Sequence, residues 1–218
     1  ITMSFAGIPN SKFMVLRKNE PISFDSVAKN LGLPFFIKPA NAGSSVGVHK
    51  IKSESDYSVK LQDAFQYDHK IIAEEFIQGR EIECSVMGLN REPQAATPGE
   101  LVVKHEFYSY EAKYLDENGA EIVIPAQLTE IETEKIRSLA TRTYTALNCD
   151  GMARVDFFMR PDGSLIVNEL NTLPGFTKIS MYPMMWQARG LSYSDLITKL
   201  IDVAFKKFNM DSEIKLTF

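Results

Sequence analysis

The sequence is poor in cysteine and histidine, and this scarcity excludes several kinds of site. Its two cysteines, Cys84 and Cys149, lie in no CxxC pattern, so they predict neither a disulfide framework nor a thiolate metal site. The three histidines (His49, His69 and His105) lack the spacing of metal ligands. We therefore expect buried or unreactive thiols in a protein of the reducing cytoplasm.

Long apolar runs and a surplus of positive charge are also absent. The 24 Lys and Arg residues against 28 Asp and Glu residues give a net charge of −4, which argues against a nucleic-acid scaffold. No run is long and apolar enough to span a bilayer, and no signal-peptide pattern opens the chain. A length of 218 residues suits one large globular domain or two small ones.

What the sequence does contain is an alternation of short strands and helices. In the first half, Ser23 and Ser53 are expected N-caps of two helices, and the order β-α-β-β-α-β predicts an α+β fold. The expected strands are Ser11–Arg17, Leu33–Lys38, a run ending at Ile51, Ile71–Phe76 and Glu81–Met87.

Two longer helices are expected in the second half. Thr129 and Glu132 form a capping box at the start of one, and the other begins near Ser192. In the last helix we expect the apolar residues to face the core, namely Leu196, Ile197, Leu200, Ile201, Ala204 and Phe205.

The segment from Gly151 to Gly175 predicts a β-hairpin. Two apolar runs, Met152–Met159 and Leu165–Asn171, are joined by Arg-Pro-Asp-Gly, whose residues favour a turn.

Alternation along these two strands predicts a polar face. Arg154 and Asp156 share a face of the first strand, and Glu169 and Asn171 share a face of the second, with Val167 beneath them. If the two faces coincide, their oxygen ligands suit Mg²⁺ or Mn²⁺. The alternative is a solvated strand face, but such a face normally mixes Lys, Thr and Glu. We therefore favour a metal site.

Two further stretches could bind a nucleotide. The small-residue loop Ala42–Gly47 could cradle phosphates, although it is no P-loop and by itself is more often a tight hairpin turn; Lys38 at the end of the preceding strand favours the phosphate site. Glu74 to Glu81 looks like a crossover between domains, whose carboxylates and backbone could read adenine and ribose. In isolation the crossover is better explained as an edge strand.

The tyrosine-rich segment Tyr108–Tyr114 holds Lys113 among aromatic and charged residues. A surface loop is the alternative, but three tyrosines in seven residues favour a loop that folds over a ligand.

Four stretches in this order resemble the D-alanine–D-alanine ligase family of the ATP-grasp superfamily. They are FFIKPANAGSSVGV, AEEFIQGREIECSV, EFYSYEAKY and ARVDFF followed by NELNTLPGFTKISMYP, and the resemblance runs from about Leu31 to Phe205. It implies an ATP-grasp fold, in which two subdomains grip ATP between antiparallel sheets. Residues 1–80 would be the small central subdomain, and residues 81–218 the C-terminal subdomain with the catalytic hairpin and a mobile loop.

The resemblance implies a set of nucleotide-binding residues. Lys38 would contact the α- and β-phosphates, and Lys113 would meet the γ-phosphate from the mobile loop. The loop that would close over the phosphates consists of Gly43, Ser44, Ser45, Val46 and Gly47. Adenine would be held by Glu74 and by the backbone of Phe76 and Ile77, and ribose by Glu81.

It also implies the metal ligands and the catalytic groups. Asp156, Glu169 and Asn171 would bind two Mg²⁺ (or Mn²⁺) ions, with Glu169 bridging them. Arg154 and the N–H of Gly175 would stabilise the tetrahedral intermediate. Ser180 would bind the carboxylate of the second substrate, and Tyr114 would bond to Ser44 and hold the loop closed.

The implied reaction is the ATP-dependent joining of two D-alanines through an acylphosphate, for peptidoglycan precursors. Tyr114 stands where ligases that form D-alanyl–D-lactate usually carry histidine, which favours the dipeptide-forming type. Two alternatives stay open: another ATP-grasp carboxylate–amine ligase, and a nucleotide-binding module without activity of its own.

The family resemblance also implies a missing part. Family members carry an N-terminal domain that this sequence lacks, and the chain begins ITMSF with no initiator Met. We therefore expect a piece of a longer protein that is catalytically incomplete by itself. Members are commonly homodimers, often through that domain, so a homodimer concerns the full-length protein and this chain's own state is left open.

Overall fold

The computed structural model describes residues 2–20, 22–43, 45–103 and 120–214, which fall into two compact units. Ser11–Gln78 form the body of the smaller unit, and the larger unit contains residues 1–10, 79–102 and 122–218. The first ten residues, which include helix α1 (Thr2–Phe5), were assigned to the first subdomain from the sequence. In the structure Ile8 is buried in the core of the larger unit, so this segment belongs there.

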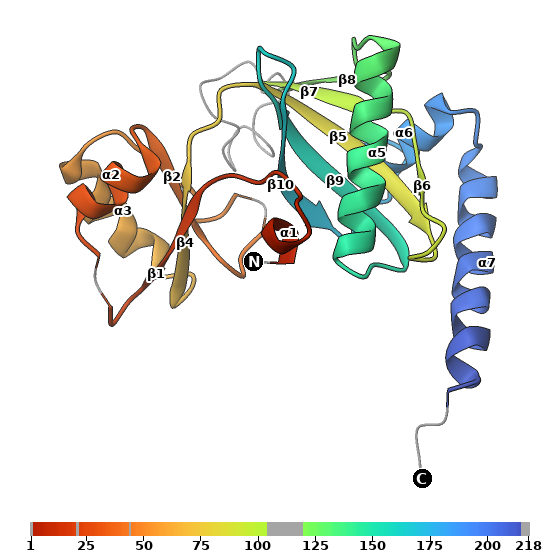
Figure 1. Cartoon of the computed structure of the whole chain (residues 1–218), viewed down its shortest axis with the longest axis horizontal. Helices are drawn as coiled ribbons and strands as arrows, with labels where there is room; N and C mark the ends of the chain where they lie inside the picture. The colour runs from red at the N-terminus through yellow and green to blue at the C-terminus, as the bar shows by residue number, and fades with distance from the viewer. Residues whose placement is uncertain (1, 21, 44, 104–119, 215–218) are drawn as a thin grey trace. The chain divides into compact units, whose positions relative to one another are not determined.

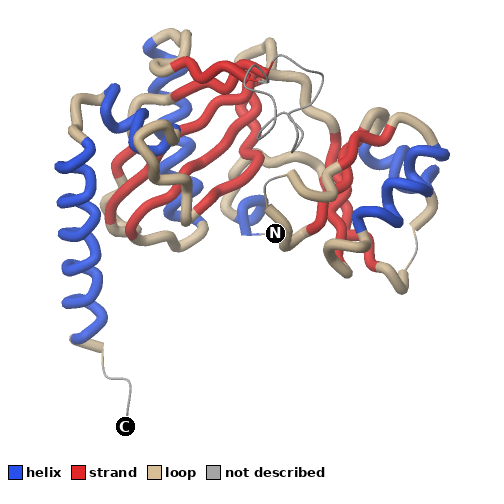
Figure 2. Tube along the Cα trace, turned by 180° about the vertical axis from the view of Figure 1, so that it is seen from behind, coloured by secondary structure: helices blue, strands red, loops and turns tan. Residues whose placement is uncertain are grey.

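The smaller unit is a four-stranded antiparallel sheet with two helices on one side (Figure 2). Both helices begin as predicted, because Ser23 caps the first by accepting from the N–H of Ser26, and Ser53 caps the second. In spatial order the strands are β1 (Phe13–Arg17), β4 (Lys70–Glu75), β2 (Phe35–Pro39) and β3 (His49–Ile51), and the helices are α2 (Phe24–Leu31) and α3 (Glu54–Ala64).

Apolar side chains of the small sheet alternate toward these helices. Phe35, Ile37 and Ile71 are fully buried against Val27 and Tyr57. The intervening positions of the same strands, which include Lys38 and Glu74, therefore lie on the face that the helices leave uncovered.

The larger unit is built on a second antiparallel sheet (Figure 1). Its hairpin matches the predicted one, and the central strand follows directly from the crossover segment. In spatial order the strands are β10 (Leu165–Asn171), β9 (Gly151–Met159), β5 (Arg80–Gly88), β7 (Gly99–Val103) and β8 (Ala120–Val123), with β6 (Gln94–Ala95) paired to β5.

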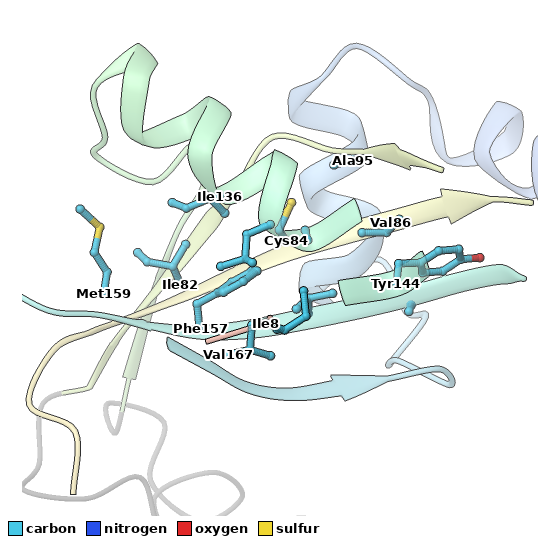
Figure 3. Packing of buried hydrophobic residues seen from close by; sticks show 14 of the residues in the cluster. Ile8, Ile82, Cys84, Val86, Ala95, Ile136, Tyr144, Phe157, Met159 and Val167 are labelled. Atoms are coloured by element: carbon cyan, nitrogen blue, oxygen red, sulfur yellow. The ribbon is translucent and has the colours of Figure 1, made fainter. Parts of the chain in front are cut away.

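Helix α5 (Glu130–Ala146) covers one face of this sheet. Ile82, Cys84 and Phe157 point toward it and pack with Ile136 and Tyr144 in the main core (Figure 3). The capping box predicted at the start of this helix is present, with its threonine and glutamate side chains satisfying each other's backbone N–H. Both cysteines are buried and free, as expected.

Helices α6 (Met181–Ala188) and α7 (Tyr193–Ser212) cover part of the opposite face. Met87 of β5 packs there with Met185 and Trp186. The hydroxyl of Ser85 donates to the carbonyl of Tyr182 at 3.1 Å, which ties α6 to the middle of β5. Beyond this contact, the same face of β5 continues with Glu83, which lies outside the apolar cluster that α6 and α7 form with the described residues.

The prediction that α7 buries a broad apolar face was wrong. Leu196 is buried and Leu200 packs beside it, but Ile197, Ile201 and Phe205 are 38%, 51% and 65% exposed. The helix contacts the unit along one narrow stripe and runs past the edge of the sheet (Figure 1). Among the described residues, no helix is long and apolar enough to cross a membrane.

Candidate active site

A bulge in β10 decides which side chains face the polar side of the larger sheet. Val167 pairs with Phe157, both in the core under α5, whereas Glu169 pairs with Asp156. The register shift between Val167 and Glu169 lies at Asn168. Strict alternation would put Val167 and Glu169 on the same face, so the bulge keeps the valine in the core and turns the glutamate to the opposite side.

The resulting register brings the predicted ligands onto one face. Residues directly opposite in antiparallel strands share a face, so Glu169 lies beside Asp156, and Asn171 lies beside Arg154. Asp156 in turn lies opposite Glu83 of β5, and Arg154 lies opposite Ser85. One row across three strands is therefore Glu169–Asp156–Glu83, and the next is Asn171–Arg154–Ser85. The coincidence of faces that the sequence left conditional is present.

Among the described residues of this face, Arg154 is the cation that contacts the carboxylates. Its Nε and Nη2 donate to the two oxygens of Asp156 at 2.7 Å each, and Nε also lies 3.0 Å from Oε2 of Glu83. Burial alone would lower the pKa of Arg154, but the hydrogen bond and charge of Asp156, with the charges of Glu83 and Glu169, outweigh it and raise this pKa. The guanidinium is therefore permanently charged.

Sequence reasoning missed Glu83 as a member of the site. It is 8% exposed, and burial together with the Asp156 charge raises the pKa of its carboxyl from 4.5 to about 8, against the opposing effect of Arg154. A signal was available in the sequence. Glu81, Glu83 and Ser85 alternate with the core residues Ile82 and Cys84, which places both glutamates on one strand face.

The donor set of this face fits divalent cations. Three carboxylates (Glu83, Asp156 and Glu169) act on the Arg154 guanidinium, and Glu81 lies on the same face of β5 as Glu83. Among the described residues these carboxylates outnumber the arginine and supply hard oxygen ligands. Within the described part of the chain, no three Asp, Glu, His or Cys side chains converge as ligands of one ion. Arg154 takes both oxygens of Asp156, and the amide oxygen of Asn171 accepts from the N–H of Leu173 at 2.9 Å.

The helix-free face of the smaller sheet carries the predicted phosphate and adenine residues. Lys38 Nζ lies 2.9 Å from Oε2 of Glu74, with both side chains partly exposed. Lys38 was predicted to bind the phosphates and Glu74 the adenine, but in the structure these two side chains form an ion pair with each other. A ligand that binds Lys38 through its phosphates would have to replace Glu74 as the partner of this ammonium.

Aromatic rings lie beside this pair. Phe76 is 37% exposed, its ring centroid is 6.1 Å from that of Phe36, and Lys50 Nζ lies 4.5 Å above it. Ile77, by contrast, is buried. Glu81 falls at the start of β5 in the larger unit.

The predicted phosphate loop contains two residues with left-handed backbone. Ser45 has φ 59° and Gly47 has φ 68°. A Cβ at Gly47 would come within 2.7 Å of the Tyr67 ring and 2.9 Å of Pro39, so only glycine fits there. Gly43 is exposed, and its carbonyl accepts from the N–H of Val46 in a turn.

Gly175 and Ser180 lie close together before α6. A Cβ built on Gly175 would lie 3.0 Å from the Ser180 hydroxyl oxygen. That hydroxyl accepts from the N–H of Thr177 at 3.1 Å and makes no capping bond to its own helix. The serine is therefore held near the glycine backbone. Three predicted site residues, Ser44, Lys113 and Tyr114, lie outside the described residues.

Comparison with known proteins gives a consistent family. Residues 2–202 match the family model described as the C-terminus of D-ala D-ala ligase. The chain is 50% identical over 214 residues to D-alanine–D-alanine ligase A of Escherichia coli K12, and 51% identical over 212 residues to D-alanine–D-alanine ligase of Oceanobacillus iheyensis. These alignments cover 97% and 96% of this chain, but 58% of each relative, so the chain spans little more than half of their length.

Solved structures agree with the sequence comparison. The D-alanine–D-alanine ligase of Coxiella burnetii superposes with a TM-score of 0.85 at 33% identity, over 97% of this chain and 56% of that one. The VanG D-Ala:D-Ser ligase of Enterococcus faecalis superposes with a TM-score of 0.84 at 36% identity, over 93% and 59%.

Proposed function

The chain belongs to the D-alanine–D-alanine ligase family, and we propose that it supplies the nucleotide, metal and acyl-transfer residues of an ATP-dependent ligase that joins two D-alanines. The protein would act in the cytoplasm on precursors of peptidoglycan. One observation carries the proposal: the register of β9 and β10 gathers Asp156, Glu169 and Asn171 on one sheet face beside Arg154.

In the proposed reaction, the carboxylate of the first D-alanine attacks the γ-phosphorus of ATP, and ADP leaves. The amine of the second D-alanine then attacks the acylphosphate carbon and loses a proton, and inorganic phosphate leaves with the former carboxylate oxygen. Both steps build negative charge on oxygen, so the protein must present fixed donors and cations where that charge develops.

Residues of the larger unit would supply these groups. Asp156, Glu169 and Asn171 would hold divalent metal, with Mg²⁺ and Mn²⁺ equally suited to the oxygen donors, and two ions as the proposed number. Bound metal would neutralise phosphoryl charge and orient the reacting oxygens. Arg154 and the N–H of Gly175 would donate to the oxyanion of the tetrahedral intermediate. Losing one such donor typically costs on the order of 10²-fold in rate.

The second substrate would meet the start of α6. The Ser180 hydroxyl makes no capping hydrogen bond to α6, and the first N–H groups of this helix would bind a carboxylate favourably. In the smaller unit, Lys38 would exchange Glu74 for the α- and β-phosphates, which frees Glu74 for the adenine amine beside the Phe76 and Ile77 backbone. Residues 43–47 would cover the phosphates, and Glu81 would accept from ribose.

The residues outside the described part complete the proposal. Lys113 would meet the γ-phosphate, and Tyr114 with Ser44 would hold the loop closed, which protects the acylphosphate from water. Because the relatives are longer, a homodimer and full activity are proposed for a protein of their length only.

The test is D-alanine-dependent release of phosphate from Mg-ATP, by this chain and by a version extended to the length of its relatives. We expect release by the extended protein, and its loss in Glu169→Gln. Glu130→Gln, which removes an exposed carboxylate at the start of α5, should keep full activity. Release that survives Glu169→Gln would refute the metal assignment.

A second acceptor deserves a direct comparison, because one of the solved relatives is named as a D-Ala:D-Ser ligase. Product analysis with D-alanine, D-serine and D-lactate as acceptors separates the candidates. Preference for D-serine would replace D-alanine as the second substrate while leaving the nucleotide and metal residues in place.

A further inference from the structure

Arg154 is shared between two carboxylates, and the sharing is unequal. Its Nε carries a single hydrogen, which is donated to Asp156 at 2.7 Å, although Oε2 of Glu83 lies only 3.0 Å from the same nitrogen. Nη2 donates to the other oxygen of Asp156 at 2.7 Å. Asp156 therefore holds the guanidinium with two hydrogen bonds, while Glu83 Oε2 lies beside it without accepting one.

Glu83 Oε2 is a buried oxygen that accepts no hydrogen bond from any residue that the structure describes. The neighbouring polar side chain on this face of β5 does not serve it, because the Ser85 hydroxyl donates to the carbonyl of Tyr182. Buried polar atoms are nearly always paired in native proteins, so a lone carboxylate oxygen beside an arginine requires an explanation.

The explanation lies in the competing use of Asp156. We propose that Glu83 is a positioning residue that takes over the Arg154 guanidinium when the Asp156 carboxylate turns to a divalent metal ion. This inference rests on the proposed function, which makes Asp156 a metal ligand.

The geometry suits such an exchange. Glu83 and Asp156 are directly opposite each other in the β5–β9 register, so both carboxylates approach Arg154 from adjacent strands. The Nε of Arg154 is already within hydrogen-bonding distance of Glu83, so a small rotation redirects its N–H without moving the backbone. With Glu83 as the acceptor, Arg154 stays beside the reacting centre while Asp156 becomes available to the ion.

The measurement is Mn²⁺ affinity, followed by electron paramagnetic resonance of free Mn²⁺ in the presence of saturating ADP, with circular dichroism as a check of folding. Glu83→Gln has no carboxylate to offer Arg154, so the guanidinium should stay on Asp156. We expect Mn²⁺ affinity to fall on the order of tenfold, the scale usual for residues that orient metal ligands.

A double-mutant cycle separates positioning from simple charge attraction. In an Arg154→Gln background there is no guanidinium to reposition, so Glu83→Gln should change Mn²⁺ affinity by less than about twofold. An equal loss in both backgrounds would overturn the inference, because Glu83 would then act only as a negative charge near the ion. No loss in either background would overturn it as well.

Glu100→Gln is the matched control. Glu100 is also buried and accepts two hydrogen bonds from an arginine, Arg80, but it lies opposite Ile82 and so belongs to the other face of the sheet. Its replacement should leave Mn²⁺ affinity unchanged. If Glu83→Gln does not fold, Glu83→Asp replaces it in the cycle, since the shorter side chain withdraws the acceptor from Arg154.

Failure of the proposed function gives a different pattern. Asp156→Asn should abolish tight Mn²⁺ binding if Asp156 is a ligand. If the unmodified chain binds no Mn²⁺, or Asp156→Asn binds it normally, the metal assignment and this inference both fall. If Asp156→Asn loses binding but Glu83→Gln does not, only the inference falls.

Discussion

The buried carboxyl of Glu83 predicts that the metal-free protein becomes less stable as the pH rises. Burial and the Asp156 charge raise the pKa of this group from 4.5 to about 8 in the folded chain. Between these two values the folded state holds a proton that the unfolded state has released. The free energy of unfolding therefore decreases with increasing pH across this window, and the loss is complete above about pH 8.

The magnitude can be worked from the same contacts. At 1.36 kcal/mol per pKa unit, the difference between 4.5 and about 8 caps the loss at roughly 5 kcal/mol. The opposing effect of the Arg154 charge is already contained in that pKa, so we expect a loss of at most roughly 5 kcal/mol in wild type.

The assay is urea unfolding followed by circular dichroism, with EDTA present, at several pH values from about 5 to about 9. The Gln side chain in Glu83→Gln cannot titrate. Between about pH 5 and about pH 9 the free energy of unfolding of this variant should therefore fall less than that of wild type, by the loss expected for Glu83. Glu130→Gln, the exposed control on α5, should follow wild type. If the wild-type and Glu83→Gln curves run parallel, the carboxyl is ionised in the folded state and the reasoning is wrong.

Three smaller predictions test the packing. Phe157→Ala should lower the free energy of unfolding by about 3–5 kcal/mol in urea titrations, because this ring is buried under α5, whereas Phe205→Ala on the exposed side of α7 should cost below about 1 kcal/mol. Thr129→Ala should cost about 1 kcal/mol in the same titrations, through loss of the capping box. Cys84, whose thiol pKa burial raises to about 12, should react with a thiol reagent at neutral pH only after denaturation, as judged by reaction rate.

Much of the fold could be predicted because local signals agreed with tertiary structure. The serine caps of α2 and α3, the capping box of α5 and the turn residues of the hairpin all lie where the sequence placed them. The ATP-grasp assignment and the family are confirmed by the solved relatives. The roles of the individual site residues stay predictions.

The exposure of α7 could not be predicted from its sequence. Ile197, Ile201 and Phe205 recur at helical spacing, which marks an apolar face but not the surface that covers it. The described part of the larger unit covers only the neighbouring stripe around Leu196 and Leu200. Periodicity measures the amphipathicity of a helix, whereas burial depends on which elements reach it.

The polar face of the larger sheet could also not be predicted completely, because it depends on one extra residue in β10. Simple alternation gives Glu169 and Asn171 a common face but would place Val167 there too, and only the bulge at Asn168 sends Val167 to the core. The sequence Leu165–Asn171 does not by itself specify an extra residue. The bulge depends on the partner strand β9, in which Phe157 faces the core under α5 and Asp156 faces the opposite side. A second register, that of β5 against β9, sets Glu83 opposite Asp156. Glu83 looks in the sequence like an ordinary alternating strand residue, and only the pairing of the two strands makes it the neighbouring competitor for Arg154.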